Sequence, residues 1–279
     1  MLKALYWRIN LSLKKIKSKR LKKKLGKNVK AIITESKNGI FAVDPEDLEV
    51  GQKILSGGFA IDEINRLKSH INSNSNILII GTHIGSVAIP LSTYCKSVTA
   101  IEANPNTFDL LMINIQLNNS TNIKTHNVFA GDKHEKVDFL LNTVNSGGSK
   151  RKPKKSNFLY EYDNPETIQL DSVPLDEYLG DEQFDLILID IEGSEYFAMK
   201  GMKEILSNCK TLVVEFLPHH LKNVAGISVE QFVSVLPKHF KNFHLPNNNQ
   251  THEFSKTSEV LQKLYDSNLG EDGIIFTSK

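Results

Sequence analysis

Three carboxylates follow an apolar run in the stretch DLILIDIEGSE. Leu186–Ile189 lead directly into Asp190 and Glu192, and Glu195 closes the stretch. A carboxylate at the end of a buried strand can orient a hydroxyl, remove its proton as a general base or help to bind a divalent cation. Asp190 and Glu192 share a side if the strand continues, so we predict that both are catalytic. We expect Glu195 at the start of the next helix, where the helix dipole favours an acid.

Two alternatives to this chemistry stay open. Glu192 could instead pair with a lysine such as Lys200. Beyond another apolar run, the stretch VVEFLPHH carries His219 and His220, and either histidine could be a base, a ligand or neither. We predict no metal site, although a divalent cation is compatible with the carboxylates.

A glycine turn follows an earlier apolar run in IIGTHIGS, residues 79–86. Gly81 lets the backbone turn sharply and approach a ligand, and Gly85 opens the next helix without a side chain in the way. His83 stands where the dinucleotide fingerprint has a glycine, and it could be a hydrogen-bonding partner. We predict Gly81, His83 and Gly85 as cofactor-binding residues.

Glu102 ends the next apolar run, in TAIEANP, about twenty residues after the glycine turn. An acid in this place accepts hydrogen bonds from ribose hydroxyls in nucleoside-binding sheets. We predict an adenosine pocket formed by Glu102 with Ala103 and, after a third strand, Phe129, Ala130 and Asp132. The alternative for Glu102 is a solvated charge at a strand end.

The elements that position these residues follow from the hydrophobic pattern. From residue 76 onward, short apolar runs alternate with helical segments, and such runs indicate a parallel sheet covered on both faces. We therefore predict an α/β fold with a doubly wound, mostly parallel sheet. The last two strands, KNFHLP and GIIFTSK, could form an edge pair. The predicted strands cover residues 76–81, 97–103, 123–130, 184–190 and 210–216.

The chain divides into three predicted parts. Residues 31–75 form a lead-in unit, with a hairpin around Asn38-Gly39 and a helix across AIDEINRLKSHI, and residues 76–279 form the main domain. Within it, residues 142–168 are rich in Gly, Ser, Asn, Pro and Lys and are too long for a simple connection. We predict a flexible loop here, either a lid with Lys150–Lys155 free to contact anionic groups or a solvated insertion.

Residues 1–30 form a basic arm on an acidic body. The arm holds twelve Lys/Arg and no acid, whereas the other 249 residues hold 22 Lys/Arg and all 32 Asp/Glu. Its apolar residues have helical spacing. The arm could lie on an anionic membrane surface, pack on the body or remain solvated. We expect no nucleic acid partner, because we find no binding motif. The apolar residues of this stripe are Leu2, Tyr6, Ile9, Leu13 and Ile16.

Composition limits the class of protein. With 40% hydrophobic and 24% charged residues, the chain is typical of a globular protein. No apolar run reaches the ~18 residues of a membrane span, and no secretory signal stands at the N-terminus. We expect a cytoplasmic protein, with the arm as a candidate contact to the inner membrane surface. Cys95 and Cys209 lack metal-like or redox-like spacing and are expected as buried free thiols.

The motifs together resemble the FkbM-type S-adenosylmethionine-dependent methyltransferases. That family shows D-x-G-A-N-x-G, then E-P-x-P with a helix ending in N-x-x-x-N, and later K-x-D-x-E-G-x-E. Asn145 and Ser149, in VNSGGS, match a further element that the resemblance places facing the active site. The resemblance covers approximately residues 38–217. Its motifs here are IIGTHIGS, IEANPNTFDLLMINIQLN, VNSGGS, LDEYL and ILIDIEGSEYFAMKG.

The resemblance implies a class I methyltransferase fold with S-adenosylmethionine as cofactor. It also implies methyl transfer to a hydroxyl of a saccharide, glycolipid or secondary metabolite. The chain departs from the family at Ile79, where the family has an acid, and at Thr82-His83, where it has Ala-Asn. Leu188 replaces the family's lysine. The alternative function is therefore a divergent or non-catalytic binding protein on the same fold.

Overall fold

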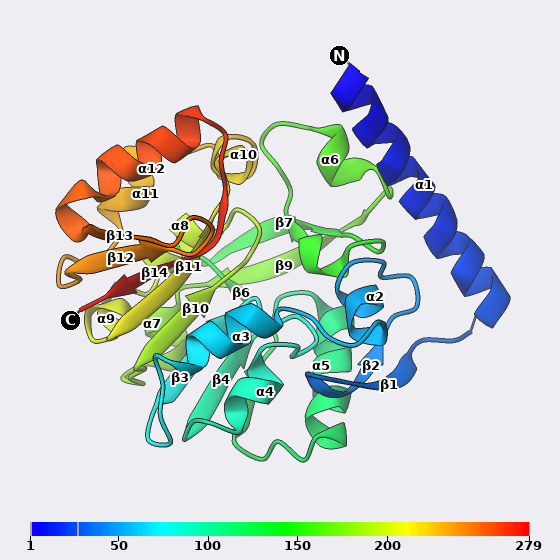
Figure 1. The fold of residues 1–279 in the computed structure, drawn as a ribbon, viewed down its shortest axis with the longest axis horizontal. Helices are drawn as coiled ribbons and strands as arrows, with labels where there is room; N and C mark the ends of the chain where they lie inside the picture. The colour runs from blue at the N-terminus through cyan, green and yellow to red at the C-terminus, as the bar shows by residue number, and fades with distance from the viewer. Residues whose placement is uncertain (1, 27, 279) are drawn as a thin grey trace.

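The computed structural model describes residues 2–26 and 28–278, and it describes the side chains of the first helix only from residue 8. Within these residues, an eight-stranded sheet runs in the order β13-β12-β14-β11-β10-β3-β4-β5 (Figure 1). The five strands from β11 to β5 in this order run parallel to one another. Beyond them, β14 pairs antiparallel with β11, β12 with β14, and β13 with β12. This confirms the predicted doubly wound, mostly parallel α/β fold. The strands are β3 (Asn76–Ile80), β4 (Ser97–Ile101), β5 (Ile123–His126), β10 (Leu186–Ile189), β11 (Thr211–Phe216), β12 (Asn242–Leu245), β13 (Gln250–Glu253) and β14 (Glu271–Thr277).

Both faces of the sheet are covered because its central strands are apolar on both sides. In β3, Ile77 and Ile79 pack into one buried cluster, and Leu78 and Ile80 pack into another on the opposite face. The first cluster includes side chains of α3 (Ile61–Lys68) and α4 (Ala88–Ser92). The second includes side chains of α7 (Leu175–Leu179), α8 (Glu195–Lys200), α9 (Lys203–Ser207), α11 (Val229–Ser234) and α12 (Thr257–Asp266).

The strand order reverses between β3 and β10. Strands β4 and β5 extend the sheet from one side of β3, whereas β10 and β11 extend it from the other. Ile80 and Ile189 are paired at the ends of β3 and β10, so the residues that follow these strands emerge side by side. Open α/β sheets bind ligands at this topological switch point.

The third predicted strand, residues 123–130, is divided in the structure. Its first part is β5, but β6 (Phe129–Ala130) leaves the main sheet and pairs with β9 (Glu166–Val173). A second sheet in the described chain has the order β6-β9-β7-β8, with β7 (Glu135–Leu141) and β8 (Lys150–Arg151). The segment 142–168 therefore holds β8, the 3-10 turn η1 (Ser146–Gly148), α6 (Phe158–Glu161) and the start of β9. Its mobility stays a prediction.

The expected hairpin is present as β1 (Ile32–Ser36) and β2 (Gly39–Val43), followed by α2 (Val50–Leu55). Asn114 on α5 (Pro105–Leu117) holds this hairpin in place. Its carbonyl accepts from Ala42 N–H at 2.7 Å, and its amide donates to the carbonyl of Ile84 at 2.9 Å. Asn114 is the first asparagine of the N-x-x-x-N motif, and it ties the lead-in unit to the glycine turn.

The remaining elements lie at the ends of the chain and near β11. Strands β12 and β14 do pair, but β14 lies inside the sheet and β13 forms the edge, so the expected edge position of this pair is wrong. The helix α1 (Leu2–Leu25) runs along one side of the body beside α2 and α6 (Figure 1). Among the described residues, no helix is both long and apolar enough to cross a membrane. The short elements are α10 (Pro218–His220), η2 (Leu221–Ala225) and η3 (Phe254–Lys256).

Candidate functional site

Gly81 and Asp190 meet where β3 and β10 end. Gly81 has φ +89°, and a Cβ atom at this position would lie 1.8 Å from the carbonyl oxygen of Asp190. Any other residue would therefore push the two strand ends apart. The glycine predicted from the sequence is required here by both the turn and the close approach of Asp190.

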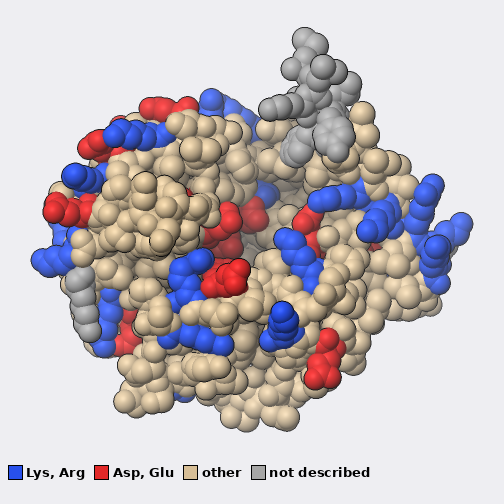
Figure 2. Space-filling model, viewed as in Figure 1, with Lys and Arg blue, Asp and Glu red and all other residues tan. Residues whose placement is uncertain are grey.

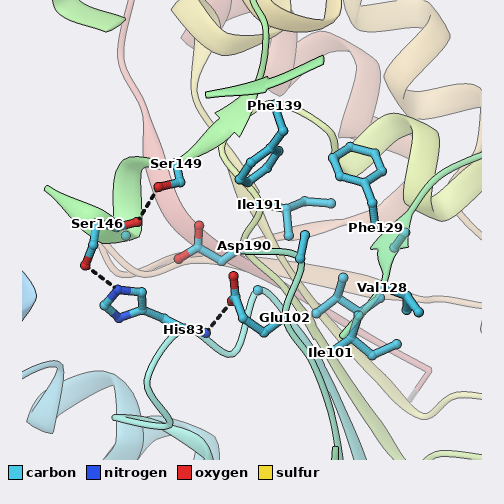
Figure 3. A pocket seen from close by; sticks show the side chains of 15 residues that line it. His83, Ile101, Glu102, Val128, Phe129, Phe139, Ser146, Ser149, Asp190 and Ile191 are labelled. Carbon is cyan, nitrogen blue, oxygen red and sulfur yellow. Dashed lines mark hydrogen bonds between the residues drawn. The ribbon is translucent and has the colours of Figure 1, made fainter. Parts of the chain in front are cut away.

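A narrow cavity of about 50 Å³ opens at this point (Figure 3). Its wall is mostly apolar, with a few polar groups, which is the usual composition of a small-molecule site. Of the residues predicted to bind a cofactor, Gly81, His83, Glu102 and Ala103 line it. The predicted Phe129 and Ala130 line it too. The other lining residues are Ile80, Ile101, Val128, Phe139, Ser146, Gly147, Ser149, Asp190 and Ile191.

Glu102 is buried rather than solvated, so the alternative drawn from the sequence is wrong. Its side chain is 7% exposed. Its carboxylate accepts from the N–H groups of His83 (2.7 Å) and Asn104 (2.8 Å) and from the hydroxyl of Thr107 (3.0 Å). Because a carboxylate offers about four acceptor positions, these bonds from the described residues leave one for a ligand hydroxyl.

His83, which also lines the cavity, has an unused acceptor. Its Nε2 lies 2.7 Å from the hydroxyl of Ser146, which donates its one proton to Asp47 at 2.7 Å. Nε2 must therefore carry the histidine proton, and Nδ1 is left as an acceptor. Nδ1 is buried and has no hydrogen-bond partner in the described part of the chain. Burial lowers the pKa of His83 to about 4, so the ring is neutral near pH 7.

Two residues predicted to contact the cofactor do not line the cavity. A Cβ atom on Gly85 would lie 2.9 Å from side chains of Ile89 and Leu111, so this glycine serves the packing of the turn against α5. Asp132 lies in the bend that follows β6, and its carboxylate pairs with Lys200 at 2.7 Å. The prediction that Asp132 lines the adenosine pocket is wrong, because nothing in the sequence indicates that β6 leaves the main sheet.

The cavity adjoins a wider cleft of about 570 Å³. Gly81, His83, Gly147 and Asp190 line both spaces. Figure 2 shows acidic side chains gathered in the hollow at the centre of this face. The acidic residues that line the cleft are Glu49, Glu63, Asp190, Glu192, Glu215 and Asp272.

Asp190 is the carboxylate without protein partners at the junction of cavity and cleft. It is exposed to the hollow, and no group in residues 2–26 or 28–278 donates a hydrogen bond to its side chain. Desolvation within the hollow, together with the charges of Glu192 and Glu63, raises its pKa well above the ordinary value. A carboxylate with a raised pKa is a better general base near neutral pH.

Glu192 faces the cleft but is already engaged. Its Oε2 accepts from the ammonium of Lys150 at 2.9 Å and lies 3.2 Å from Nε2 of His220. Nδ1 of His220 lies 3.4 Å from Glu215. The alternative that Glu192 pairs with a lysine is therefore confirmed, but the lysine is Lys150 and not Lys200, which pairs with Asp132. Lys150, expected to be free for anionic groups, is also buried, at 5% exposure.

The side chains of Glu192, Glu215 and His220 could hold a metal ion, because one donor atom from each lies within 4.8 Å of the others. Lys150 already contributes a positive charge to this cluster. Burial raises the pKa of Glu215 and lowers that of His220. Both shifts favour the neutral forms of these two side chains, and the ammonium of Lys150 pairs with the carboxylate of Glu192.

Glu195 begins α8, as expected, and holds the turn after β10. Its carboxylate accepts from the N–H groups of Ile191 (3.1 Å) and Gly193 (3.0 Å). Burial raises its pKa to about 7. Glu192 has φ +56°, a strained conformation for a non-glycine residue, and the bonds from Glu195 support the turn that contains it.

Sequence reasoning missed several lining residues. Ser146 and Gly147 come from the segment 142–168, beside Asn145 and Ser149, which the resemblance placed in the active site. Asn145 does line the cleft, and Ser149 lines the cavity. Asp47, which orients Ser146, carried no signal of its own. The sequence indicated only that three further lining residues are apolar, namely Val128, Phe139 and Ile191.

The family model for the methyltransferase FkbM domain matches residues 80–265. The chain belongs to the FkbM methyltransferase family. No curated protein matches it. The matched region of this FkbM family member contains all the residues that line the cavity and about half of those that line the cleft, whereas α1 and the hairpin lie outside it.

Solved structures similar to this family member include a methyltransferase FkbM from Methylobacillus flagellatus KT, at 16% identity and TM-score 0.44. The alignment covers 74% of this chain and 44% of that one. TYW2 from M. jannaschii, in complex with AdoMet, aligns at 17% identity and TM-score 0.39, over 67% of this chain and 62% of that one. This chain therefore spans less than two thirds of either protein, and such distant overlaps carry no argument about its chemistry.

The register explains two departures from the family pattern. Ile79 and Leu188 are paired on β3 and β10, and both belong to the same buried cluster. The acid and the lysine of the family pattern would therefore be neighbours here. This member has replaced both charges, and neither position leaves an unpaired charge behind.

Proposed function

We propose that this protein is an S-adenosylmethionine-dependent O-methyltransferase whose acceptor is a hydroxyl of a saccharide, glycolipid or secondary metabolite. Membership of the FkbM family supports methyl transfer. The observation that carries the proposal is the position of Asp190, an unpaired carboxylate that borders both the narrow cavity and the acidic cleft.

The residues of the cavity fit the nucleoside part of the cofactor. The apolar wall suits an adenine ring, the remaining acceptor position of Glu102 suits a ribose hydroxyl, and Nδ1 of His83 suits a second donor. The cavity is smaller than the ~300–1,000 Å³ of typical ligand pockets. Binding therefore requires the segment with Ser146 and Ser149 to move outward, or the ligand to extend into the cleft.

The bound cofactor would supply a methyl group already activated for transfer, so the protein mainly positions the acceptor. We infer that Asp190 accepts a hydrogen bond from the acceptor hydroxyl and takes its proton as the oxygen gains the methyl group. Glu192, held by Lys150 and His220, would orient a second hydroxyl. No step requires a metal ion, and a divalent cation at Glu192, Glu215 and His220 is a separate question.

The acidic cleft also bears on the acceptor class. Carboxylates accept hydrogen bonds from sugar hydroxyls, but they repel the phosphates of a nucleic acid. A neutral, hydroxyl-rich acceptor therefore fits better than RNA. Contact of residues 1–30 with a membrane is a separate proposal.

The test compares Asp190→Asn with the natural protein. We expect turnover to fall by about 10²–10⁴-fold, the usual contribution of general base catalysis, while calorimetry shows little change in S-adenosylmethionine affinity. Glu102→Gln should give the reverse pattern, with weaker cofactor binding and a smaller loss of turnover at saturating cofactor. If Asp190→Asn keeps full turnover, the assignment of the base is wrong.

The alternative is a non-catalytic binding protein on the same fold, and the apolar pair Ile79 and Leu188 favours it. One titration separates the two functions. If neither S-adenosylmethionine nor S-adenosylhomocysteine binds to the folded protein, the enzyme proposal fails and the binding protein remains.

A further inference from the structure

The helix α1 contacts the body through one face, which we call the inner face. The hydroxyl of Ser18 donates to the carbonyl of Glu46 at 2.8 Å, and the ammonium of Lys22 lies 3.3 Å from the carboxylate of the same residue. Lys14 pairs with Glu49. The inner face is therefore tied down by polar contacts of Lys14, Ser18 and Lys22.

Three apolar residues of α1 lie on the opposite side, whereas Leu11 and Leu21 are half-buried on the side of the inner face. Ile9, Leu13 and Ile16 are 49%, 55% and 46% exposed. Their spacing of four and three places them on one side of a helix, about half a turn from Ser18 at 3.6 residues per turn. These three residues form what we call the outer stripe. The helix does pack on the body, as one of the alternatives drawn from the sequence has it, but through the inner face and not through Ile9, Leu13 and Ile16. Leu2 and Tyr6 of the predicted stripe lie outside the described side chains.

Cations surround the outer stripe. Lys17, Arg20, Lys23 and Lys24 are exposed, and residues 1–30 contain no acid that would offset them. Long basic side chains beside an apolar stripe can keep their charges in the headgroup layer while their stems and the stripe enter the interface. The exposed face thus has the two components that an anionic lipid surface recognises.

We propose that the outer stripe docks α1 on an anionic lipid bilayer, with the helix lying in the plane of the surface. A second copy of the chain would bring two basic arms together, and like charges repel. A nucleic acid would satisfy the lysines but leave the stripe in water. The inference does not depend on methyl transfer, because α1 lies outside the part of the chain that matches the family.

The experiment is vesicle flotation of the full chain. We expect it to float with vesicles that contain phosphatidylglycerol and phosphatidylcholine, and not with phosphatidylcholine alone. The variant Ile9→Gln/Leu13→Gln/Ile16→Gln should bind about tenfold more weakly or worse, because it removes apolar side chains from the interface. Glutamine keeps the helix propensity of the replaced residues, and circular dichroism checks the fold.

The matched control is Ile33→Gln/Ile113→Gln/Leu269→Gln, which replaces three exposed aliphatic residues elsewhere, at 63%, 42% and 58% exposure. It should float like the natural chain. Equal loss in the control overturns the assignment to α1. Failure of the natural chain to float, or equal flotation with neutral vesicles, overturns the proposal. So does a concentration-dependent dimer that the outer-stripe variant abolishes. Because vesicles contain no methyl acceptor or cofactor, these outcomes leave the proposed activity untouched.

Discussion

Asp190 and Glu192 stand two residues apart at the end of one strand, yet their surroundings differ. Asp190 has no hydrogen-bond donor among the described residues, whereas Glu192 is bound to Lys150 and His220. Asp190 is therefore free to accept a proton, whereas Glu192 is held in place by Lys150 and His220. The sequence placed both at the right edge of the sheet, but only their neighbours separate their roles.

His83 provides a prediction at the same scale. The pKa of its ring falls from 6.5 to about 4 in the folded protein. Between these values the unfolded chain binds a proton that the folded chain does not, so stability is complete above pH 6.5 and falls as the pH drops. At pH 5 this group alone should cost about 2 kcal/mol.

The variant His83→Asn should remove that contribution. Asparagine tolerates the φ of +54° at this position, and the family pattern has asparagine here. Urea unfolding at pH 7 and pH 5 measures the effect, which is the difference between the pH dependences of the two proteins. Identical pH dependences would show that His83 does not titrate abnormally.

At the scale of elements, the register between β3 and β10 sets the most informative contact. It brings Asp190 beside Gly81 at the switch point, and it pairs Ile79 with Leu188 below them. The first pairing builds the site. The second joins two apolar residues at positions where the family pattern has charges, and the surrounding buried cluster accepts the apolar pair.

A double-mutant cycle tests this pairing. Ile79→Asp and Leu188→Lys should each destabilise the protein by about 3 kcal/mol or more, because each buries a charge without a partner. The double variant should be more stable than the sum predicts, by about 0.5–3 kcal/mol, since the two charges become neighbours. Urea unfolding of the natural protein and the three variants gives the four free energies of the cycle. Simple additivity would mean that the two side chains do not interact.

At the scale of the whole molecule, a basic arm is joined to an acidic body. The ion pairs of α1 with the body are partly exposed, and exposed ion pairs contribute little, typically about 0–1 kcal/mol each. The hairpin of β1 and β2, in contrast, is bonded to α5 through a buried asparagine. The boundary near residue 30 is therefore expected to separate a docking arm from a self-sufficient body.

Removal of residues 1–30 tests that boundary. The truncated protein should remain folded and lose only about 1–2 kcal/mol of stability, which lowers the melting temperature by a few degrees in a chain of this size. Thermal unfolding followed by circular dichroism measures the change. An unfolded truncated chain would show that the arm is part of the core.

Much of the main domain could be predicted because its signals are local. Strands β3, β4, β10 and β11 are buried on both faces, so each must be a short apolar run. Parallel strands present their carboxyl ends at one edge, so Gly81, Glu102 and Asp190 had to gather there. These statements need only the chain order and the hydrophobic pattern.

Other features depend on contacts between segments far apart in the sequence. The second sheet forms because β6 pairs with β9 more than thirty residues away, and this pairing carries Asp132 to Lys200 and brings Ser146 to His83. The buried Lys150 pairs with Glu192, which lies far from it in the sequence.

The sequence by itself determined the parallel sheet, the edge at which Gly81, Glu102 and Asp190 gather, and the family. The tertiary structure decided which acid is free, which lysine is buried and which side of α1 faces outward. The physical reason is that the spacing of apolar residues shows which face of a helix or strand is apolar. What packs on that face depends on how the rest of the chain folds.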